Sequence, residues 1–147
     1  MGVPVSAILE HKGHAVITTS PRTPVAEAAR LMSDERVGAL VVTGELGGVE
    51  GIVSERDVVQ CVAQHGVEAL GGPVEEVMTR SVTTCTPTTD STELAATMTE
   101  GRIRHLPVVD DGRLVGLVSI GDVVKSRLGE LATQAESLER YITGTAY

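Results

Sequence analysis

The sequence predicts an α/β fold made of two similar βαββα units, related by a pseudo-twofold axis and followed by an extended C-terminal helix. The run Gly51–Asp57 recurs 65 positions later as Gly116–Asp122, which indicates an internal duplication. Short β-prone segments alternate with segments of helical periodicity in both halves. The last helical segment is much longer than its counterpart in the first half, and this extra length predicts the C-terminal extension.

The first unit is expected to begin with one helical turn at Pro4–Leu9, because proline is favoured at the first position of a helix. Apolar periodicity and turn residues then predict a strand at 15–18, a helix at 25–35, strands at 39–42 and 49–53, and a helix from about residue 55 to residue 65.

The second unit repeats this order with a helical turn at 73–78, a strand at 81–84, a helix at 91–101, strands at 105–109 and 114–118, and a helix at 120–142. The sequence Asp110-Asp111-Gly112 between its last two strands is a strong hairpin signal. A glycine-rich joint lies between the units. We therefore assign residues 1–70 to the first unit, 71–125 to the second and 126–147 to the helix extension.

Composition limits what the protein can bind. The net charge of −8 argues against a nucleic-acid groove, because phosphate backbones bind to basic surfaces. The chain contains no Phe or Trp, so a flat ligand is expected to lie against aliphatic side chains. No apolar run approaches the roughly 20 residues of a membrane span, and no signal-peptide pattern is found. Two cysteines make no disulfide framework, so a reduced, cytoplasmic location away from membranes is expected.

Each unit places Ser-x-x-Asp where a predicted strand ends and a helix begins, as Ser54 with Asp57 and Ser119 with Asp122. One interpretation is structural: the serine caps the helix and the acid interacts favourably with the helix N-terminus. The other is functional: backbone N–H groups and the serine hydroxyl bind a phosphate, and the aspartate accepts hydrogen bonds from a vicinal diol. Duplication does not decide between them, because a copied helix also copies its cap.

The two units resemble a tandem pair of CBS domains, the cystathionine-β-synthase type of regulatory module, over roughly residues 4–124. The most specific matches are the runs at 51–57, 102–109 and 116–122. In that family the pair binds adenosine-containing ligands such as AMP, ADP, ATP, S-adenosylmethionine or NAD in clefts between its halves. The resemblance implies that the two aspartates hold ribose hydroxyls and that the two serines lie near phosphates, which favours the functional interpretation.

One implied cleft lies beside Ser119 and Asp122, and we call it the Asp122 cleft. The resemblance places Arg104 and His105 near its phosphates. The first half is expected to supply the adenine slot through Lys12, Ala15, Ile17 and Val37. The match at Lys12 is the weakest of these, because residues 10–14 are an insertion relative to the second half.

The other implied cleft lies beside Ser54 and Asp57, and we call it the Asp57 cleft. Its further residues are expected to be Thr79, Ser81, Thr83 and Ile103. The positions that correspond to Arg104 and His105 are here Gly38 and Ala39, so that basic contribution is expected to be missing, with Arg56 as a replacement. The two clefts are therefore expected to prefer different ligands.

Several other residues have two interpretations. Arg36 and Arg102 end equivalent helices and are taken to complement the helix dipoles. His105 is explained equally well as a buried structural histidine or as a phosphate contact. His11 and His14 invite a metal interpretation, but nothing nearby completes a ligand set, so no metal is expected.

The C-terminal helix carries an apolar stripe spaced alternately by four and three residues, which is a heptad pattern. The stripe consists of Val124, Leu128, Leu131, Ala135, Leu138 and Ile142. It packs either on its own unit or on a partner helix. The length beyond the repeat favours a partner, and CBS pairs commonly dimerise through their helices, so a homodimer is expected.

No catalytic triad or P-loop pattern is found, so neither an enzymatic activity nor a catalytic cofactor is expected. Two functions remain. In the first, AMP, ADP, ATP or NAD bridges the two halves and changes a surface seen by an unknown regulated protein, so that the chain senses energy or redox state. In the second, the chain is a dimeric scaffold or interaction protein without a ligand. The polar residues around the Asp122 cleft favour the sensor.

Overall fold

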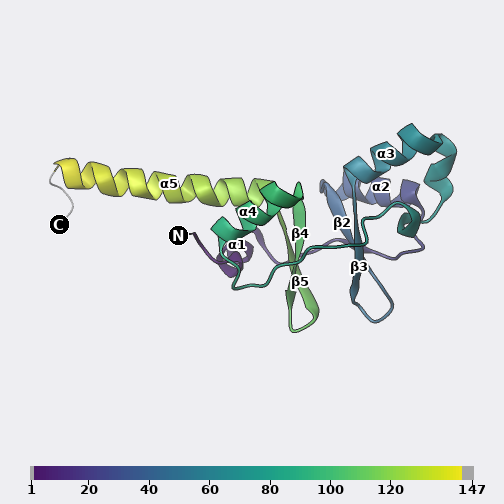
Figure 1. The fold of residues 1–147 in the computed structure, drawn as a ribbon, viewed down its shortest axis with the longest axis horizontal. Coiled ribbons are helices and arrows are strands. Elements are labelled where there is room, and N and C mark those ends of the chain that lie inside the picture. The colour runs from purple at the N-terminus through teal and green to yellow at the C-terminus, as the bar shows by residue number, and fades with distance from the viewer. Residues whose placement is uncertain (1, 144–147) are drawn as a thin grey trace.

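Residues 2–143 are described here from a computed structural model, and they form two α/β halves with a long helix extending away from them (Figure 1). The first half contains β1 (Thr18–Thr19), α2 (Val25–Glu35), β2 (Ala39–Thr43), β3 (Val49–Ser54) and α3 (Glu55–His65). The second contains α4 (Ser91–Gly101), β4 (His105–Asp110), β5 (Arg113–Ser119) and the start of α5 (Ile120–Thr143). The chain begins with α1 (Val5–Lys12), and the 3-10 helices η1 (Val67–Gly71) and η2 (Val74–Glu76) join the halves.

The sheets have the expected hairpins at their centre. In the first half, β1 pairs parallel with β2, which pairs antiparallel with β3 so that Ala39 lies opposite Ser54. In the second half, β4 and β5 are antiparallel, and their turn holds Asp111 and Gly112 at φ of 50° and 76°. Aspartate and glycine both tolerate this left-handed backbone, so the predicted hairpin is confirmed. In Figure 1, α2 and α3 lie together over one end of the first sheet.

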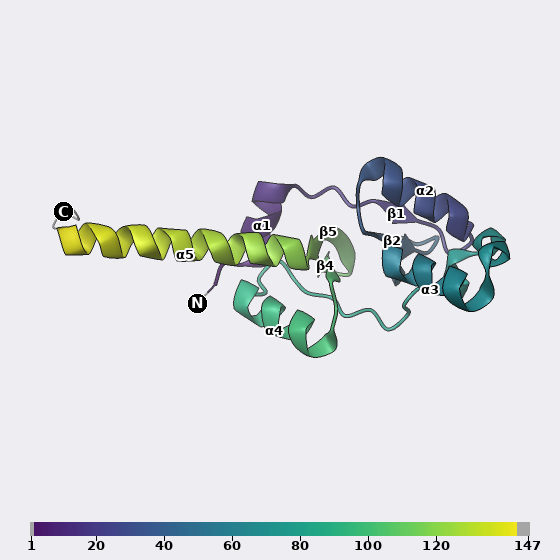
Figure 2. The same cartoon turned by 90° about the horizontal axis from the view of Figure 1, so that it is seen from above.

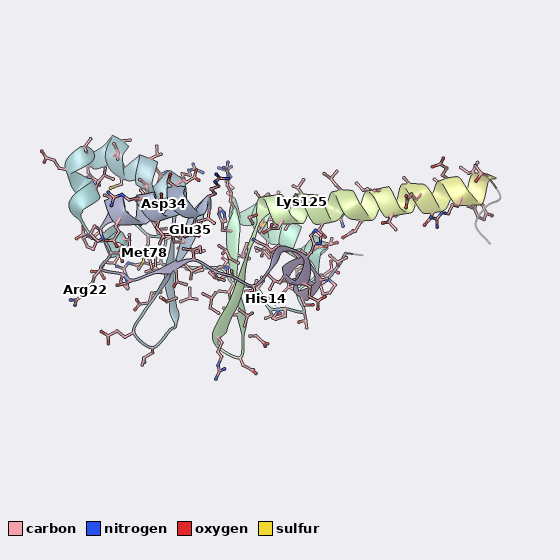
Figure 3. The ribbon with its side chains drawn as sticks, turned by 180° about the vertical axis from the view of Figure 1, so that it is seen from behind. His14, Arg22, Asp34, Glu35, Met78 and Lys125 are labelled. Carbon is pink, nitrogen blue, oxygen red and sulfur yellow. The ribbon has the colours of Figure 1, made fainter. Side chains whose placement is uncertain are left out.

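The N-terminal segment of each repeat packs on the opposite half. Val5 and Leu9 of α1 are buried in the core of the second half, and Val74 and Met78 are buried in the core of the first half, where Figure 3 labels Met78. Equivalent backbone hydrogen bonds hold the two exchanged segments. The Val5 N–H donates to the Thr89 carbonyl and the Val74 N–H donates to the Thr23 carbonyl, both at 2.8 Å. The two halves in space therefore do not coincide with the two repeats along the chain.

This exchange brings side chains against glycines in the sheets. A Cβ at Gly116 would lie 2.8 Å from Leu9 Cδ1. At the equivalent Gly51, a Cβ would lie 2.6 Å from Met78 Sδ and 2.8 Å from the Thr79 carbonyl oxygen. All three distances are too short for a real side chain, so the two glycines permit the exchanged segments to approach the sheets.

The expected strand at 81–84 does not form. The equivalent strand of the first repeat, expected at 15–18, is limited to Thr18–Thr19. Only Cys85 in the second half bridges to β4, through its N–H to the Pro107 carbonyl at 3.0 Å and its carbonyl to the Val109 N–H at 2.9 Å. In the first half, the N–H of Val41 donates to the Ile17 carbonyl at 3.2 Å. Pro107 stands at the place of Val41 and has no N–H to donate, so the ladder cannot extend towards residue 83.

The expected helical turn at Pro4–Leu9 is longer than predicted. It continues to Lys12 and ends at Gly13, whose φ is 104°. The inserted residues 10–12 therefore add a further turn to α1, and this turn carries Lys12 to the N-terminal end of α5.

The long helix α5 confirms the expected C-terminal extension. Figures 1 and 2 both show that it leaves the second half beside α1 and α4 and then continues alone. Within residues 2–143, none of the helices combines the length and the apolar content needed to cross a bilayer.

Candidate functional site

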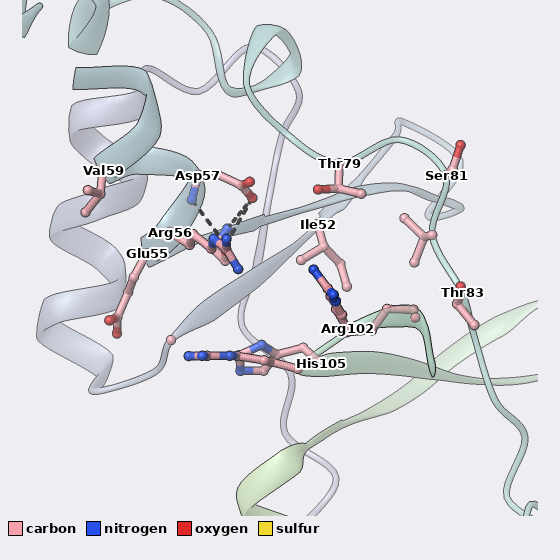
Figure 4. Close-up of a pocket in the computed structure, with 16 residues that line it drawn as sticks. Ile52, Glu55, Arg56, Asp57, Val59, Thr79, Ser81, Thr83, Arg102 and His105 are labelled. Atoms are coloured by element: carbon pink, nitrogen blue, oxygen red, sulfur yellow. Dashed lines mark hydrogen bonds between the residues drawn. The ribbon is translucent and has the colours of Figure 1, made fainter. Parts of the chain in front are cut away.

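A cavity of about 810 Å³ lies between the two halves, on the side of Asp57 (Figure 4). Three segments form most of its wall: the junction of β3 and α3, the linker that enters the second half, and the junction of α4 and β4. The lining residues are Gly38, Ile52, residues 54–57, Val59, Thr79, residues 81–83 and residues 101–105. The volume falls within the usual range of small-molecule sites.

Ser54 and Asp57 form a capping box at the start of α3. The Ser54 N–H donates to Asp57 Oδ2 at 2.9 Å, and the Asp57 N–H donates to Ser54 Oγ at 3.3 Å (Figure 4). These bonds satisfy backbone donors of the first helical turn and fix the direction of the carboxylate. Because a carboxylate can accept several hydrogen bonds, a capping role leaves acceptor capacity on Asp57 for a ligand.

Basic side chains from both halves line this cavity. Arg56 comes from α3, whereas Arg102, Arg104 and His105 come from the second half. Figure 4 shows the Arg102 side chain directed towards the strand that carries Ile52. The expectation that the Asp57 cleft lacks the basic contribution of Arg104 and His105 is therefore wrong.

Gly38 lies opposite His105 in this cavity. The carbonyl of Gly38 accepts the Glu55 N–H at 3.0 Å, so the backbone at Gly38 is held at the start of α3. A Cβ at Gly38 would lie 3.6 Å from two atoms of the His105 ring. This is an ordinary contact distance, so Gly38 and His105 face each other across the seam, which correspondence within the repeat did not reveal.

His105 is half-buried, and its charge state follows from this position. Burial lowers the pKa of His105, and the positive charge of Lys12 lowers it further. The carboxylates of Asp122 and Glu55 act in the opposite direction but do not compensate. The ring is therefore neutral at pH 7, and it presents one donor and one acceptor instead of a cation.

The Asp122 side has a different arrangement, although Ser119 and Asp122 form the same reciprocal bonds at 2.8 Å and 3.2 Å. Lys12 Nζ lies 2.6 Å from Asp122 Oδ2 and donates to the Leu117 carbonyl at 2.8 Å. Burial alone would raise the pKa of Asp122, but the hydrogen bonds from Lys12 and from the Ser119 backbone outweigh it and hold that pKa below its usual value. The structure thus brings Lys12, Ser119 and Asp122 together, with the lysine bound to the acid.

The remaining predicted residues do not line the Asp57 cavity. Ala39 is buried in β2, and Ala15 is exposed. Ile17 packs against the core of the first half, and Val37 lines a second groove of about 490 Å³ between α2 and α3. The proposed adenine slot at these positions stays a prediction, whereas Thr79, Ser81, Thr83 and Ile103 do lie in the cavity with Asp57.

Glu55 and Arg102 are charged residues of the cavity that the sequence did not predict for either cleft. Arg102 is the one of opposite charge to a phosphate. It follows α4 in the left-handed conformation at φ 53°, as Arg36 follows α2 at φ 57°. Both were interpreted only as ends of helices. The available signal was that Arg102 directly precedes Ile103, which the resemblance assigns to the Asp57 cleft.

Of the two histidines near the N-terminus, His14 lies against β5 of the second half. His14 Nδ1 lies 3.4 Å from the Val115 carbonyl oxygen. Among residues 2–143, no three His, Cys, Asp or Glu side chains are grouped so that they could hold a metal ion.

Comparison with solved structures gives close likenesses over most of the chain. A CBS-domain containing protein from Agrobacterium tumefaciens is 42% identical, with a TM-score of 0.83 over 85% of this chain and 99% of its own. The CBS domain pair of protein MJ0100, solved with 5′-methylthioadenosine and S-adenosyl-L-methionine, is 28% identical, with a TM-score of 0.79 over 88% of this chain and 99% of its own. A CBS domain protein from Pyrobaculum aerophilum, complexed with AMP, is 31% identical, with a TM-score of 0.77 over 89% of this chain and 99% of its own.

The model of the CBS domain family matches the chain twice, at residues 9–64 and 74–129. The two matches correspond to the two repeats, and each contains one of the Ser-x-x-Asp pairs. The chain therefore belongs to the CBS domain family, as a tandem pair of CBS domains with an extended C-terminal helix.

Proposed function

We propose that the chain is a regulatory module that binds an adenosine-containing nucleotide in the cavity beside Asp57. The observation that carries the proposal is the joint presence of one ordered carboxylate and several basic side chains in a single cavity between the halves. A phosphorylated nucleoside needs both, because its ribose donates hydrogen bonds and its phosphates accept them. Similar CBS proteins solved with AMP and with S-adenosyl-L-methionine support the adenosine part.

Asp57 is the residue that we assign to the ribose. Its Oδ2 is held by the Ser54 N–H at 2.9 Å, so the carboxylate has a fixed position before ligand binds. A fixed acidic acceptor suits a vicinal diol, as in dinucleotide-binding folds. Nearby aliphatic side chains such as Ile52 and Val82 line the same cavity and offer a surface for the base.

Arg56, Arg102 and Arg104 are the residues that we assign to the phosphates. Guanidinium groups bind phosphate oxygens through paired, charge-assisted hydrogen bonds. Three guanidinium groups favour AMP, ADP, ATP or NAD over the cationic sulfonium of S-adenosylmethionine. This choice corresponds to a sensor of energy or redox state.

Nucleotide binding is tested by measuring thermal unfolding with AMP, ADP, ATP, NAD, NADH and S-adenosylmethionine, each in excess. A ligand at about 100 times its Kd stabilises the folded chain by roughly 2.7 kcal/mol. The variant Asp57→Asn keeps an acceptor for the Ser54 N–H but removes the charge, so it should lose the response while remaining folded. Asp110→Asn, on the exposed hairpin, is the matched control. If none of the six compounds stabilises the wild type, the proposal is wrong.

A scaffold without a ligand is the second candidate, and the two capping boxes favour it. In each pair the serine and the aspartate form the reciprocal hydrogen bonds of a helix N-terminus, which is a structural role. A scaffold function does not explain why three arginines line the same cavity as Asp57. The thermal measurement separates the two, since a scaffold responds to no nucleotide.

We further propose that the chain regulates a partner protein of unknown identity. We also propose that it forms a homodimer and that it is located in the cytoplasm. Nucleotide in a cavity shared by both halves shifts their relative arrangement if the ligand prefers one arrangement. Cys61 and Cys85 are buried and unpaired, which supports a reducing compartment. We assign no catalytic step and no catalytic cofactor to the chain.

A further inference from the structure

The far part of α5 exposes an apolar face that no other segment within residues 2–143 covers. Val123 is buried at the start of the helix, but 61% of Leu128, 59% of Leu131 and 60% of Leu138 is exposed. Arg127 and Glu130 make the hydrogen bonds that tie α5 to α4. Figure 2 shows the helix continuing beyond this point away from both halves.

A helix in this situation gains stability from a partner. Isolated helices shorter than about 12–15 residues are marginal in water, and a glycine in a helix lowers stability further. Gly129 lies where α5 leaves α4, and 13 described residues of the helix follow Glu130. The exposed stripe has the alternating four and three spacing that fits one other helix.

We infer that α5 is a self-docking surface, on which the α5 helix of a second copy packs antiparallel. An alignment centred on Thr133 brings each large apolar residue of the stripe opposite an apolar residue of the partner. Val124 faces the partner's Ile142, Leu128 faces the partner's Leu138, and Leu131 faces the partner's Ala135. The two central layers thus set Leu131 against the smaller Ala135 of the partner, a combination that favours close packing.

Charge selects this direction over the parallel one. Lys125 and Glu139 flank the stripe on the same side, and the antiparallel alignment places Lys125 beside the partner's Glu139, twice per dimer. Figure 3 shows Lys125 at the base of the free helix. A parallel alignment pairs Gln134 with the partner's Glu139 and forms no ion pair at these flanking positions. It also places Ala135 opposite the partner's Ala135, which leaves a gap in the seam.

A lipid surface is the less suitable occupant. Helices that lie on membranes carry mainly Lys and Arg on their polar face. The charged residues of α5 are mixed instead: Lys125, Arg127 and Arg140 against Asp122, Glu130, Glu136 and Glu139. The whole chain is also strongly acidic, which opposes binding to anionic lipid.

Charge reversal tests the pairing in solution. Lys125→Glu and Glu139→Lys should each weaken the dimer roughly tenfold in sedimentation equilibrium, since each turns two attractive contacts into repulsive ones. The double variant should return the dimer Kd to within about twofold of the wild type. Glu136→Lys, on the outer face of the helix, is the matched control and should leave the dimer Kd unchanged. A double variant no tighter than either single variant would overturn the antiparallel assignment.

Cysteine cross-linking tests the direction independently. Under mild oxidation, the double variant Leu128→Cys with Leu138→Cys should form covalent dimers, whereas Leu128→Cys alone should not. Efficient cross-linking by Leu128→Cys alone would show parallel helices and overturn the inference. A wild-type chain that remains monomeric, or that binds anionic vesicles in preference to itself, would also overturn it. None of these outcomes depends on nucleotide binding, because the stripe and the Asp57 cavity share no residue.

Discussion

Lys12 Nζ lies 2.6 Å from Asp122 Oδ2, so the last turn of α1 places a cation on the acid that corresponds to Asp57 in the other repeat. The two acids therefore have different surroundings although their capping boxes match. Within residues 2–143, no comparable ion pair involves Asp57. The inserted turn that carries Lys12 has no counterpart in the second repeat, where the corresponding segment is the short helix η2. The duplication has thus produced two unlike sites.

Removal of the lysine should open the Asp122 cleft. In the wild-type chain, a nucleotide that binds Asp122 must displace Lys12 from a partly buried ion pair, and breaking such a pair costs free energy. We expect wild-type chain to bind about one nucleotide and Lys12→Met to bind about two, because the variant leaves the acceptor free. Isothermal titration calorimetry gives the stoichiometry. Arg113→Met removes an exposed positive charge on β5 and is the control; an unchanged stoichiometry in Lys12→Met would argue against a second site.

The two equivalent arginines provide a matched test of the phosphate assignment. Arg36 and Arg102 both follow a helix in the left-handed conformation, but only Arg102 lines the Asp57 cavity. Loss of a charged hydrogen bond at a phosphate costs about 1.5–3 kcal/mol. Arg102→Gln should therefore weaken nucleotide binding by a factor of roughly ten to a hundred, whereas Arg36→Gln should leave the affinity unchanged. Equal loss in both variants would mean that the effect comes from the helix ends and not from the cavity.

The sequence was sufficient to predict the repeated units, the hairpins and the long last helix. Their signals are local, since apolar periodicity and a turn such as Asp110-Asp111-Gly112 act over a few residues. The missing strand at 81–84 depends on Pro107, which lies in another strand and removes a donor from the shared edge. That loss can be read from a sequence only once the register of the two segments is known.

The exchange of N-terminal segments was not predicted for a related reason. The pattern of Val5, Ile8 and Leu9 shows that one face of α1 is buried, but it does not show against which half. The same limit applies to the site. The resemblance to CBS pairs placed Arg104 and His105 in the Asp122 cleft, whereas both residues line the Asp57 cavity at the seam between the halves.

His105 should make stability depend on pH. Its pKa is lowered in the folded chain, chiefly by burial, so below the ordinary histidine pKa of about 6.5 the unfolded chain binds more protons. The contribution of His105 to stability is therefore complete above that pH and is lost as the pH falls towards the lowered pKa. Urea unfolding at pH 7.5 and 5.5 should show a smaller pH dependence for His105→Gln than for wild type. An unchanged pH dependence in His105→Gln would show that this histidine is not its cause.

The two sheet glycines should differ in their tolerance of a methyl group. A Cβ at Gly51 meets the Thr79 carbonyl at 2.8 Å, and that backbone is fixed by reciprocal bonds with Ile52 at 2.8 and 3.0 Å. A Cβ at Gly116 meets only the side chain of Leu9, which can change rotamer. Gly51→Ala should therefore lower the free energy of unfolding by roughly 1–3 kcal/mol in urea titration, and Gly116→Ala by less. Gly48→Ala, where a Cβ has no neighbour within 4 Å, is the control. Because the clash at Gly51 is with the segment exchanged from the other repeat, an equal effect at Gly51 and Gly116 would show that this segment yields as readily as the Leu9 side chain.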